Sequence, residues 1–210
     1  MKKLNLLKTY TNYYSSKEIP ELVDIDEAKF ISIHAQGSFM DKIYYDRWEA
    51  LKQVANAVKD AFDDSPQAFE IAPLEALYWY NEKEYGPISI SHIYDTFPLS
   101  KLEYRLMIRI PEYITSEDIV KAKKDFAEPF RNLTSSADFF ELNEGKCVQM
   151  LHLGPFIYEG ESLEKNENFA TKNHLIKNGL HHEIYLVDFT KVKSQEGLRT
   201  ILREPVKQKE

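Results

Sequence analysis

Residues 181–187, His-His-Glu-Ile-Tyr-Leu-Val, hold the side chains best suited to chemistry in this sequence. Side chains alternate along an extended strand, so Glu183 and Tyr185 are expected on one face and Ile184 on the other. Desolvation of a carboxylate in a cavity raises its pKa, which suits general acid/base work, and a buried charge also attracts a cationic ligand. A solvated glutamate on an edge strand is the alternative. We take Glu183 as the principal charged residue of a small-molecule pocket.

Aromatic residues supply candidate walls for such a pocket. Residues 77–80, Leu-Tyr-Trp-Tyr, place three aromatic side chains in one strand, and Tyr104 opens the apolar run 104–110 that follows. Aromatic faces hold planar or cationic ligands by stacking and cation–π attraction, the latter contributing roughly 0.5–2 kcal/mol. Ordinary core packing explains the same residues equally well.

Motifs for other chemistries are missing from the sequence. The six histidines include the pair His181 and His182, but adjacent residues of a strand point to opposite faces and chelate poorly. No His-Glu-x-x-His helix, Gly-rich phosphate loop, Gly-x-Ser-x-Gly elbow or Cys-x-x-Cys pair occurs. The single cysteine, Cys147, lies in a strand-like run and is interpreted as a buried structural thiol. We therefore expect no metal and no cofactor.

Composition narrows the class of partner. The 210 residues are 43% hydrophobic, enough for a globular core, and carry a formal net charge of -7. No dense Lys/Arg block is present, which argues against a nucleic-acid partner. The apolar runs are far shorter than the roughly 20 residues that cross a bilayer. We expect a cytoplasmic protein, a monomer or homodimer, that does not bind membranes.

Hydrophobic periodicity outlines the elements. Apolar residues at steps of three or four predict helices over residues 45–62 and from Thr115 to about Leu133, the second opened by a Thr-x-x-Asp capping box. Strands are predicted near residues 30–33, 77–80, 104–110, 146–152 and 183–187. A polar helix over about residues 162–178 and a short last helix over residues 194–203 complete the pattern.

An internal repeat organises these elements. Residues 27–39 align with residues 144–156 at an offset of 117. Four pairs of aligned residues are identical: Glu27/Glu144, Lys29/Lys146, Gly37/Gly154 and Phe39/Phe156. Each copy reads as strand, glycine turn, helix and aromatic strand, and glycine suits a sharp exit at positive φ. This predicts an α+β fold of tandem duplicated β-α-β-β units with antiparallel sheets, a pseudo-twofold axis and a central ligand cleft. We expect an arm over residues 1–22, one domain over 23–206 with half-repeats of about 23–115 and 140–206, and a tail over 207–210.

Several segments resemble the GyrI-like small-molecule-binding family, which is also described as part of the SHS2-fold superfamily. They are residues 73–79 (Pro-Leu-Glu-Ala-Leu-Tyr-Trp), 106–113 (Leu-Met-Ile-Arg-Ile-Pro-Glu-Tyr), 154–156 (Gly-Pro-Phe), 182–186 (His-Glu-Ile-Tyr-Leu) and 198–206. The resemblance extends over nearly the whole chain, and these segments match best. The resemblance implies the same duplicated fold, and implies that Glu183 reaches into a central pocket that binds hydrophobic or cationic compounds.

The resemblance leaves three functions open. The first is capture of a hydrophobic or cationic small molecule, with Trp79, Tyr78, Tyr185, Phe156 and Met107 as ligand-binding residues. The second is hydrolysis of reactive, cyclopropane-type compounds, with Glu183 as acid/base and Tyr104 as assisting phenol. The third is a protein-interaction module without a ligand, which a pocket filled by its own side chains would favour. Phe156 stands where the family has tyrosine and Tyr104 where tryptophan is common, so ligand choice is not carried over.

Overall fold

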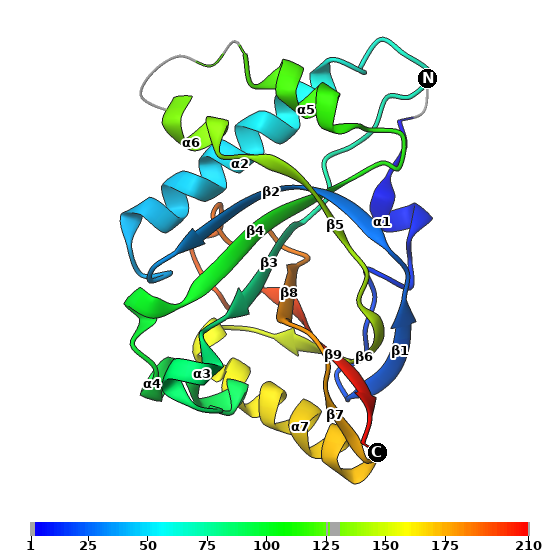
Figure 1. Cartoon of the computed structure of the whole chain (residues 1–210). Helices are drawn as coiled ribbons and strands as arrows, with labels where there is room; N and C mark the ends of the chain where they lie inside the picture. Colours follow the sequence, from blue (N-terminus) through cyan, green and yellow to red (C-terminus); the bar gives the residue numbers. More distant parts are fainter. Residues whose placement is uncertain (1–2, 125, 127–130, 210) are drawn as a thin grey trace.

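The protein is a nine-stranded antiparallel sheet with helices packed on it (Figure 1). This computed structural model describes residues 3–124, 126 and 131–209. The strand order is β1-β6-β9-β8-β3-β4-β2-β5, and β7 pairs with β9 beside this path. The expected α+β class with antiparallel pairing is confirmed.

The strands are β1 (Glu21–Ile25), β2 (Ala28–Gln36), β3 (Leu74–Trp79), β4 (Glu103–Ile110), β5 (Asp138–Leu142), β6 (Gly145–Leu153), β7 (Leu175–Lys177), β8 (His181–Tyr185) and β9 (Arg199–Gln208). The helices are α1 (Leu6–Thr9), α2 (Lys42–Asp60), α3 (Glu82–Tyr85), α4 (Ile93–Thr96), α5 (Ser116–Ala122), α6 (Arg131–Ser135) and α7 (Glu159–Lys172). Short 3₁₀ turns lie at Ile90–His92 (η1), Leu99–Lys101 (η2) and Phe156–Tyr158 (η3).

The repeat expected from sequence runs through the structure. The strands β1 and β5, the strands β2 and β6, and the first residues of α2 and α7 all stand 117 positions apart. Equivalent strands stand in the same order from either edge of the sheet: β1, β6, β9 and β8 from one edge correspond to β5, β2, β4 and β3 from the other. The strands β8 and β3 pair in the middle. The two halves are therefore related by a pseudo-twofold axis between these central strands.

The leading strand of each half is exchanged. β1 precedes β2 in the chain but pairs with β6 of the other half, and β5 precedes β6 but pairs with β2. The register repeats as well, because Glu21 faces Gln149 while Asp138 faces Ser32. Each half thus covers an outer strand of the other.

The two long helices cover the same face of the sheet on opposite sides of the axis. α2 buries an apolar stripe against β2 and β4, and Trp48 and Leu51 of this stripe are fully buried. α7 packs on β6 and β9 through a mixed stripe of Glu159, Ser162, Leu163 and Asn166. Figure 1 shows α2 and α7 over separate parts of the sheet. The central strands β3 and β8 run between them.

The opposite face of the sheet carries a buried ionic network. On this face His182 lies between two carboxylates, with Nε2 3.0 Å from Glu75 and Nδ1 3.0 Å from Glu144. Arg203 donates to Glu144 at 3.0 Å and to the backbone oxygen of Tyr13 at 2.7 Å. The Tyr13 hydroxyl donates to Glu75 at 2.5 Å. The N-terminal segment is thereby tied to strands of both halves.

Most predicted elements are confirmed, with shifted ends. The helix expected over 45–62 is α2. The capping box at Thr115 is also present, with the Thr115 backbone N–H donating to the Asp118 carboxylate. The helix expected to run to about Leu133 instead divides into α5 and α6, and Phe126 between them is not helical. Phe130, placed on its apolar stripe, lies outside the described residues.

Near the C-terminus one helix prediction is confirmed with shifted ends and a second is wrong. The polar helix begins at Glu159 and ends at Lys172, because Asn173 caps it and His174 adopts a positive φ of 56°. Residues 175–177, expected to be helical, form β7 instead. The last helix expected over residues 194–203 is replaced by a loop and β9. Ile201 and Leu202 are both buried because this part of β9 is covered on both faces, and such a run imitates helical spacing.

The glycine turns that end β2 and β6 have the expected conformation. Gly37 has φ 141° and Gly154 φ 99°, and their backbone N–H groups donate to Leu102 and Leu198 respectively. A Cβ added at Gly154 would meet no atom within 4 Å, so substitution there strains the backbone alone.

We expect Gly154→Ala to lower the free energy of unfolding by about 1–3 kcal/mol, measured by urea denaturation. Gly197→Ala is the matched control, because its Cβ also meets nothing within 4 Å and its φ is not in the positive region. The control is expected to change stability by less than about 0.5 kcal/mol. Equal effects of the two substitutions would contradict the role of the positive φ.

Within the described residues, no helix combines the length and apolar character that crossing a membrane requires.

Candidate functional site

Glu183 lies at the centre of the molecule, on β8 between β3 and β9. Its side chain is 4% exposed and faces the side of the sheet that the helices cover. The Tyr185 hydroxyl donates to Glu183 Oε2 at 2.6 Å, and His181 Nε2 lies 3.1 Å from Oε1. The expected placement of Glu183 and Tyr185 on one face holds, and the solvated alternative for Glu183 does not.

His181 joins Glu183 to a second carboxylate. Its Nδ1 contacts Glu204, whose side chain is 13% exposed. Burial lowers the pKa of His181, but the charges and hydrogen bonds of Glu204 and Glu183 outweigh it and raise the pKa to about 10. One imidazolium cation therefore lies between two carboxylates. The cluster thus holds two carboxyl groups for one cation.

A chain of tyrosine hydroxyls leads away from Glu183. The Tyr185 and Tyr78 hydroxyls lie 2.9 Å apart, and those of Tyr78 and Tyr44 lie 2.6 Å apart. Burial raises the pKa of Tyr185 and of Tyr44 well above the usual value, and the Glu183 charge adds to this. These phenols therefore stay neutral and act as hydrogen-bond donors and acceptors.

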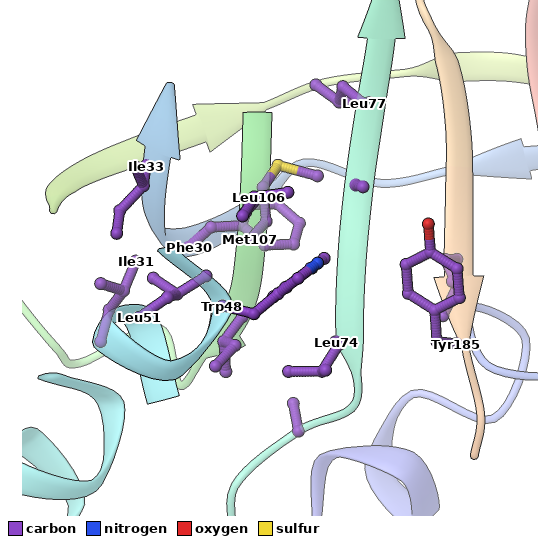
Figure 2. Packing of buried hydrophobic residues seen from close by; sticks show 14 of the residues in the cluster. Phe30, Ile31, Ile33, Trp48, Leu51, Leu74, Leu77, Leu106, Met107 and Tyr185 are labelled. Carbon is purple, nitrogen blue, oxygen red and sulfur yellow. The ribbon is translucent and has the colours of Figure 1, made fainter. Parts of the chain in front are cut away.

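Aromatic rings cover the Tyr185 side of the site. Trp48 from α2 lies edge-on to Tyr185 at 6.1 Å between ring centroids, and Figure 2 shows its indole reaching toward the central strands. Phe156 and Phe189 pack on Tyr185 at 5.8 and 4.7 Å. Phe156 comes from η3 and Phe189 from the loop between β8 and β9. Two covering rings thus stand on irregular segments and one on a long helix.

The structure gathers most, though not all, of the residues expected to form the site. Tyr78, Tyr185 and Phe156 surround Glu183 as described above. Tyr104 is farther away, with its ring 5.1 Å from Tyr44 and its hydroxyl accepting a bond from Arg47.

Trp79 and Met107 need correction as ligand-binding residues near Glu183. Trp79 follows Tyr78 on β3 and Met107 follows Leu106 on β4, so alternation turns both to the opposite face. Trp79 stacks there on His34 at 5.2 Å between ring centroids, and Met107 is fully buried in the core.

Sequence reasoning did not assign six residues of the site: His181, Tyr44, Trp48, Glu159, Phe189 and Glu204. Tyr44 and Trp48 belong to the apolar stripe of a helix, where pocket and core residues look alike. Glu159 is the first residue of α7 and lies in an acidic, polar stretch. The sequence pattern that marks Glu159 is the repeat offset, which aligns it with Lys42, the first residue of α2.

Unsatisfied polar atoms gather on the helix-covered side. Among the described residues, the buried atoms without a hydrogen-bond partner are Trp48 Nε1, Arg109 Nε, Glu159 Oε1 and Asn166 Oδ1. Three of these four belong to α2 or α7. Buried polar groups in native proteins almost always have a partner, so unpartnered ones call for an explanation such as a ligand.

The described part of the chain offers no metal-binding cluster of three His, Cys, Asp or Glu side chains. Two surface hollows are found, of about 400 Å³ between α2 and α5 and about 170 Å³ beside Glu144 and Gly179. Glu183 lines neither of them. The Glu183 side chain is 4% exposed and aromatic rings pack over its partner Tyr185, so the expected central cleft is closed at Glu183.

Solved structures with the same fold span the whole chain. An uncharacterized conserved protein from Listeria innocua is 27% identical with a TM-score of 0.82, and the match covers 98% of this chain and 100% of that one. A hydrolase from Listeria innocua is 25% identical with a TM-score of 0.81 and the same coverage. The C-terminal domain of EcmrR shares the fold at 12% identity and a TM-score of 0.53, over 90% of this chain and 98% of that one.

No protein-family model matches the chain, and a search of curated proteins finds no significant match.

Proposed function

We propose that this protein binds a hydrophobic, cationic small molecule at Glu183, as a GyrI-like binding protein. The observation that carries the proposal is the cluster of Glu183, His181 and Glu204, which sets two carboxyl groups against one imidazolium among aromatic rings. A buried charge without a full counter-ion is costly, and a bound cation would compensate it.

The surrounding side chains suit such a ligand. The rings of Tyr185, Trp48 and Phe156 offer apolar area and cation–π attraction close to the carboxylate. The Trp48 Nε1–H group lies beside the Tyr44 hydroxyl and adds a polar group to the site. This combination of an apolar wall with few polar groups is typical of small-molecule sites.

Binding requires the site to open. Phe156 and Phe189 close it from η3 and from the β8–β9 loop, and loops move at lower cost than packed helices. Filling by the protein's own side chains is the feature expected of an interaction module without a ligand. That reading gives no reason for a buried surplus charge beside unpartnered polar atoms, so we favour a ligand site that opens.

A thermal-shift screen with tetraphenylphosphonium and other lipophilic cations tests the proposal. We expect concentration-dependent stabilisation, amounting to about 2.7 kcal/mol at a ligand concentration one hundred times Kd. Glu183→Gln keeps the shape of the side chain and removes its charge, so we expect it to weaken binding of cations by at least tenfold. The affinity of neutral aromatic compounds of equal size should fall much less in this variant.

Glu141→Gln is the matched control, because Glu141 is an exposed residue of β5. This variant is expected to bind like the wild type. If no cation stabilised the wild type, or if Glu183→Gln bound cations unchanged, the proposal would be wrong.

Hydrolysis of a reactive small molecule at the same site is the second candidate. It is favoured by the similar Listeria innocua structure described as a hydrolase, together with the Tyr185–Glu183–His181 hydrogen-bond chain. Such a chain can orient a water molecule beside a carboxylate base. Mass spectrometry of cyclopropane-bearing and epoxide compounds incubated with the protein distinguishes the two functions. Intact ligand indicates binding, and a product gaining the mass of water, absent with Glu183→Gln, indicates turnover.

A further inference from the structure

We infer that Glu159 is a second functional carboxyl of the Glu183 site and donates a proton to the leaving atom of a neutral electrophilic substrate. The inference rests on the hydrolytic form of the proposed function. It adds a proton donor from α7 to a site otherwise built on β8 and β3.

The packing of α7 places Glu159 over the site. Residues 159, 162, 163 and 166 form the buried face of this helix. On that face Asn166 donates to the backbone oxygen of Leu202 at 3.1 Å, and Leu202 is the partner of Glu183 in the β8–β9 ladder. Ser162 lies 3.1 Å from His152 Nδ1, and His152 is the partner of Thr200 in the β6–β9 ladder. Glu159, one turn earlier, lies over β9 at Thr200, whose side chain hydrogen-bonds its carboxyl and which is the partner of Tyr185 in the β8–β9 ladder.

The Glu159 side chain is buried but not satisfied. It is 2% exposed, and its Oε1 has no hydrogen-bond partner among the described residues. The other fully buried glutamates have partners: Glu75 binds Tyr13, Tyr14 and His182, and Glu144 binds His182 and Arg203. A structural role explains Glu75 and Glu144. It does not explain a buried carboxyl that leaves one oxygen unused.

The environment keeps Glu159 protonated. Burial raises its pKa well above the usual value, and the charge of Glu183 adds to this, while His181 and the Thr200 hydroxyl lower it less. His152 on β6 faces the same group of residues, and burial lowers its pKa, so it brings no strong opposing charge. Glu183 accepts bonds from Tyr185 and His181, which favour its ionised form. Two carboxyls with opposite protonation states are the arrangement of a general acid and a general base.

The other candidate donors are engaged. The Tyr185 proton is directed at Glu183, and Tyr104 lies beyond Tyr44 with its oxygen bonded to Arg47. The Glu159 carboxyl, by contrast, has one oxygen, Oε1, without a hydrogen-bond partner within the described part of the chain.

The step balances without a cofactor. For an epoxide, Glu183 takes a proton from water while the water oxygen forms a bond to a ring carbon. The carbon–oxygen bond of the ring breaks, and the Glu159 proton goes to the departing oxygen. The product is a diol, Glu159 is left ionised and Glu183 protonated. Transfer of one proton from Glu183 to Glu159 restores the starting state.

Two probes with different leaving groups test the role of Glu159. Styrene oxide needs protonation of its departing alkoxide oxygen, whereas p-nitrophenyl acetate releases a stable phenolate. We expect Glu159→Gln to lower kcat on styrene oxide by about 10²–10⁴-fold, the usual contribution of general acid catalysis. On p-nitrophenyl acetate the loss should be no more than about tenfold. Glu183→Gln should reduce hydrolysis of both probes.

The outcomes separate the two proposals. Hydrolysis of both probes by the wild type, with equal losses for both in Glu159→Gln, would overturn the donor role and leave the hydrolase proposal standing. No hydrolysis of either probe by the wild type would overturn the hydrolytic function on which this inference rests.

A stability measurement tests Glu159 without any substrate. A carboxyl with a raised folded pKa costs stability as pH rises above its unfolded pKa near 4.5, because folding must keep it protonated. Glu159→Gln is therefore expected to raise Tm by about 3 °C or more at pH 8, and the gain should shrink toward pH 4. The control Glu161→Gln, two residues along the same helix and exposed, should leave Tm unchanged. A lower Tm for Glu159→Gln at pH 8 would show that the carboxyl is structural and would overturn the inference.

Discussion

Arg203→Met is expected to lower the free energy of unfolding by about 3–5 kcal/mol, the cost of breaking a buried ion pair from one side. Arg203 is fully buried and donates to Glu144, to Gln149 Oε1 at 2.9 Å and to the Tyr13 backbone. Methionine fills similar volume and supplies no donor, so the Glu144 carboxylate loses one of its two cationic partners. Urea denaturation followed by circular dichroism measures the change.

Arg199→Met is the matched control, because Arg199 lies on the same strand and is exposed. It should change stability by less than about 0.5 kcal/mol. Adding Glu144→Gln to Arg203→Met should recover part of the loss, since the second change removes the uncompensated charge. Arg203→Met with wild-type stability would mean that the network contributes nothing to the fold.

The second large effect is a loss of stability as pH rises from about 6.5 to 10. The folded pKa of His181 is raised to about 10 from the ordinary value of 6.5. A raised histidine pKa contributes stability that is fully present below the unfolded pKa and is lost as pH rises through the folded pKa. The contribution of His181 is on the order of 5 kcal/mol. His182, the next residue on the opposite face of the sheet, also has a raised pKa and acts in the same direction.

Urea unfolding at half-unit pH steps checks this expectation. His181→Gln should flatten the profile between pH 6.5 and 10, leaving the smaller slope that His182 and Glu159 produce. His34→Gln, a substitution at an exposed histidine, should keep the wild-type slope. A wild-type profile without slope over this range would show that His181 is not held as a cation.

The sequence was enough to predict the duplicated fold and the position of Glu183. Both rest on local rules: Gly37 and Gly154 mark equivalent turns, and alternation along a strand puts Tyr185 beside Glu183. The same rule, applied to β3 and β4 with the central pairing known, separates Trp79 and Met107 from the site. Without that pairing, the sequence does not show which face of β3 or β4 lies on the Glu183 side of the sheet.

The rest depended on contacts between distant parts of the chain. β1 and β5 pair across the two halves, and no local pattern specifies a partner more than one hundred residues away. Glu159 looks like a solvated helix residue, since its burial comes from β9 and the segment around Ser91, whose oxygen lies 3.1 Å from a Cβ placed at Gly160. Arg203 was expected in a helix and instead forms the centre of an ionic network.

The exchanged outer strands also bear on the order of events during synthesis. The partner of β1 is β6, so residues 21–25 must wait until residue 149 and its neighbours have left the ribosome before they can pair. At the opposite edge of the sheet, β5 of the second half is the strand that pairs with the outer side of β2 among the described residues. Contacts of such long range are slow to form because the intervening chain must be ordered first. Folding of this chain is therefore expected to finish after translation, with the first half exposing sheet edges to chaperones until the second half arrives.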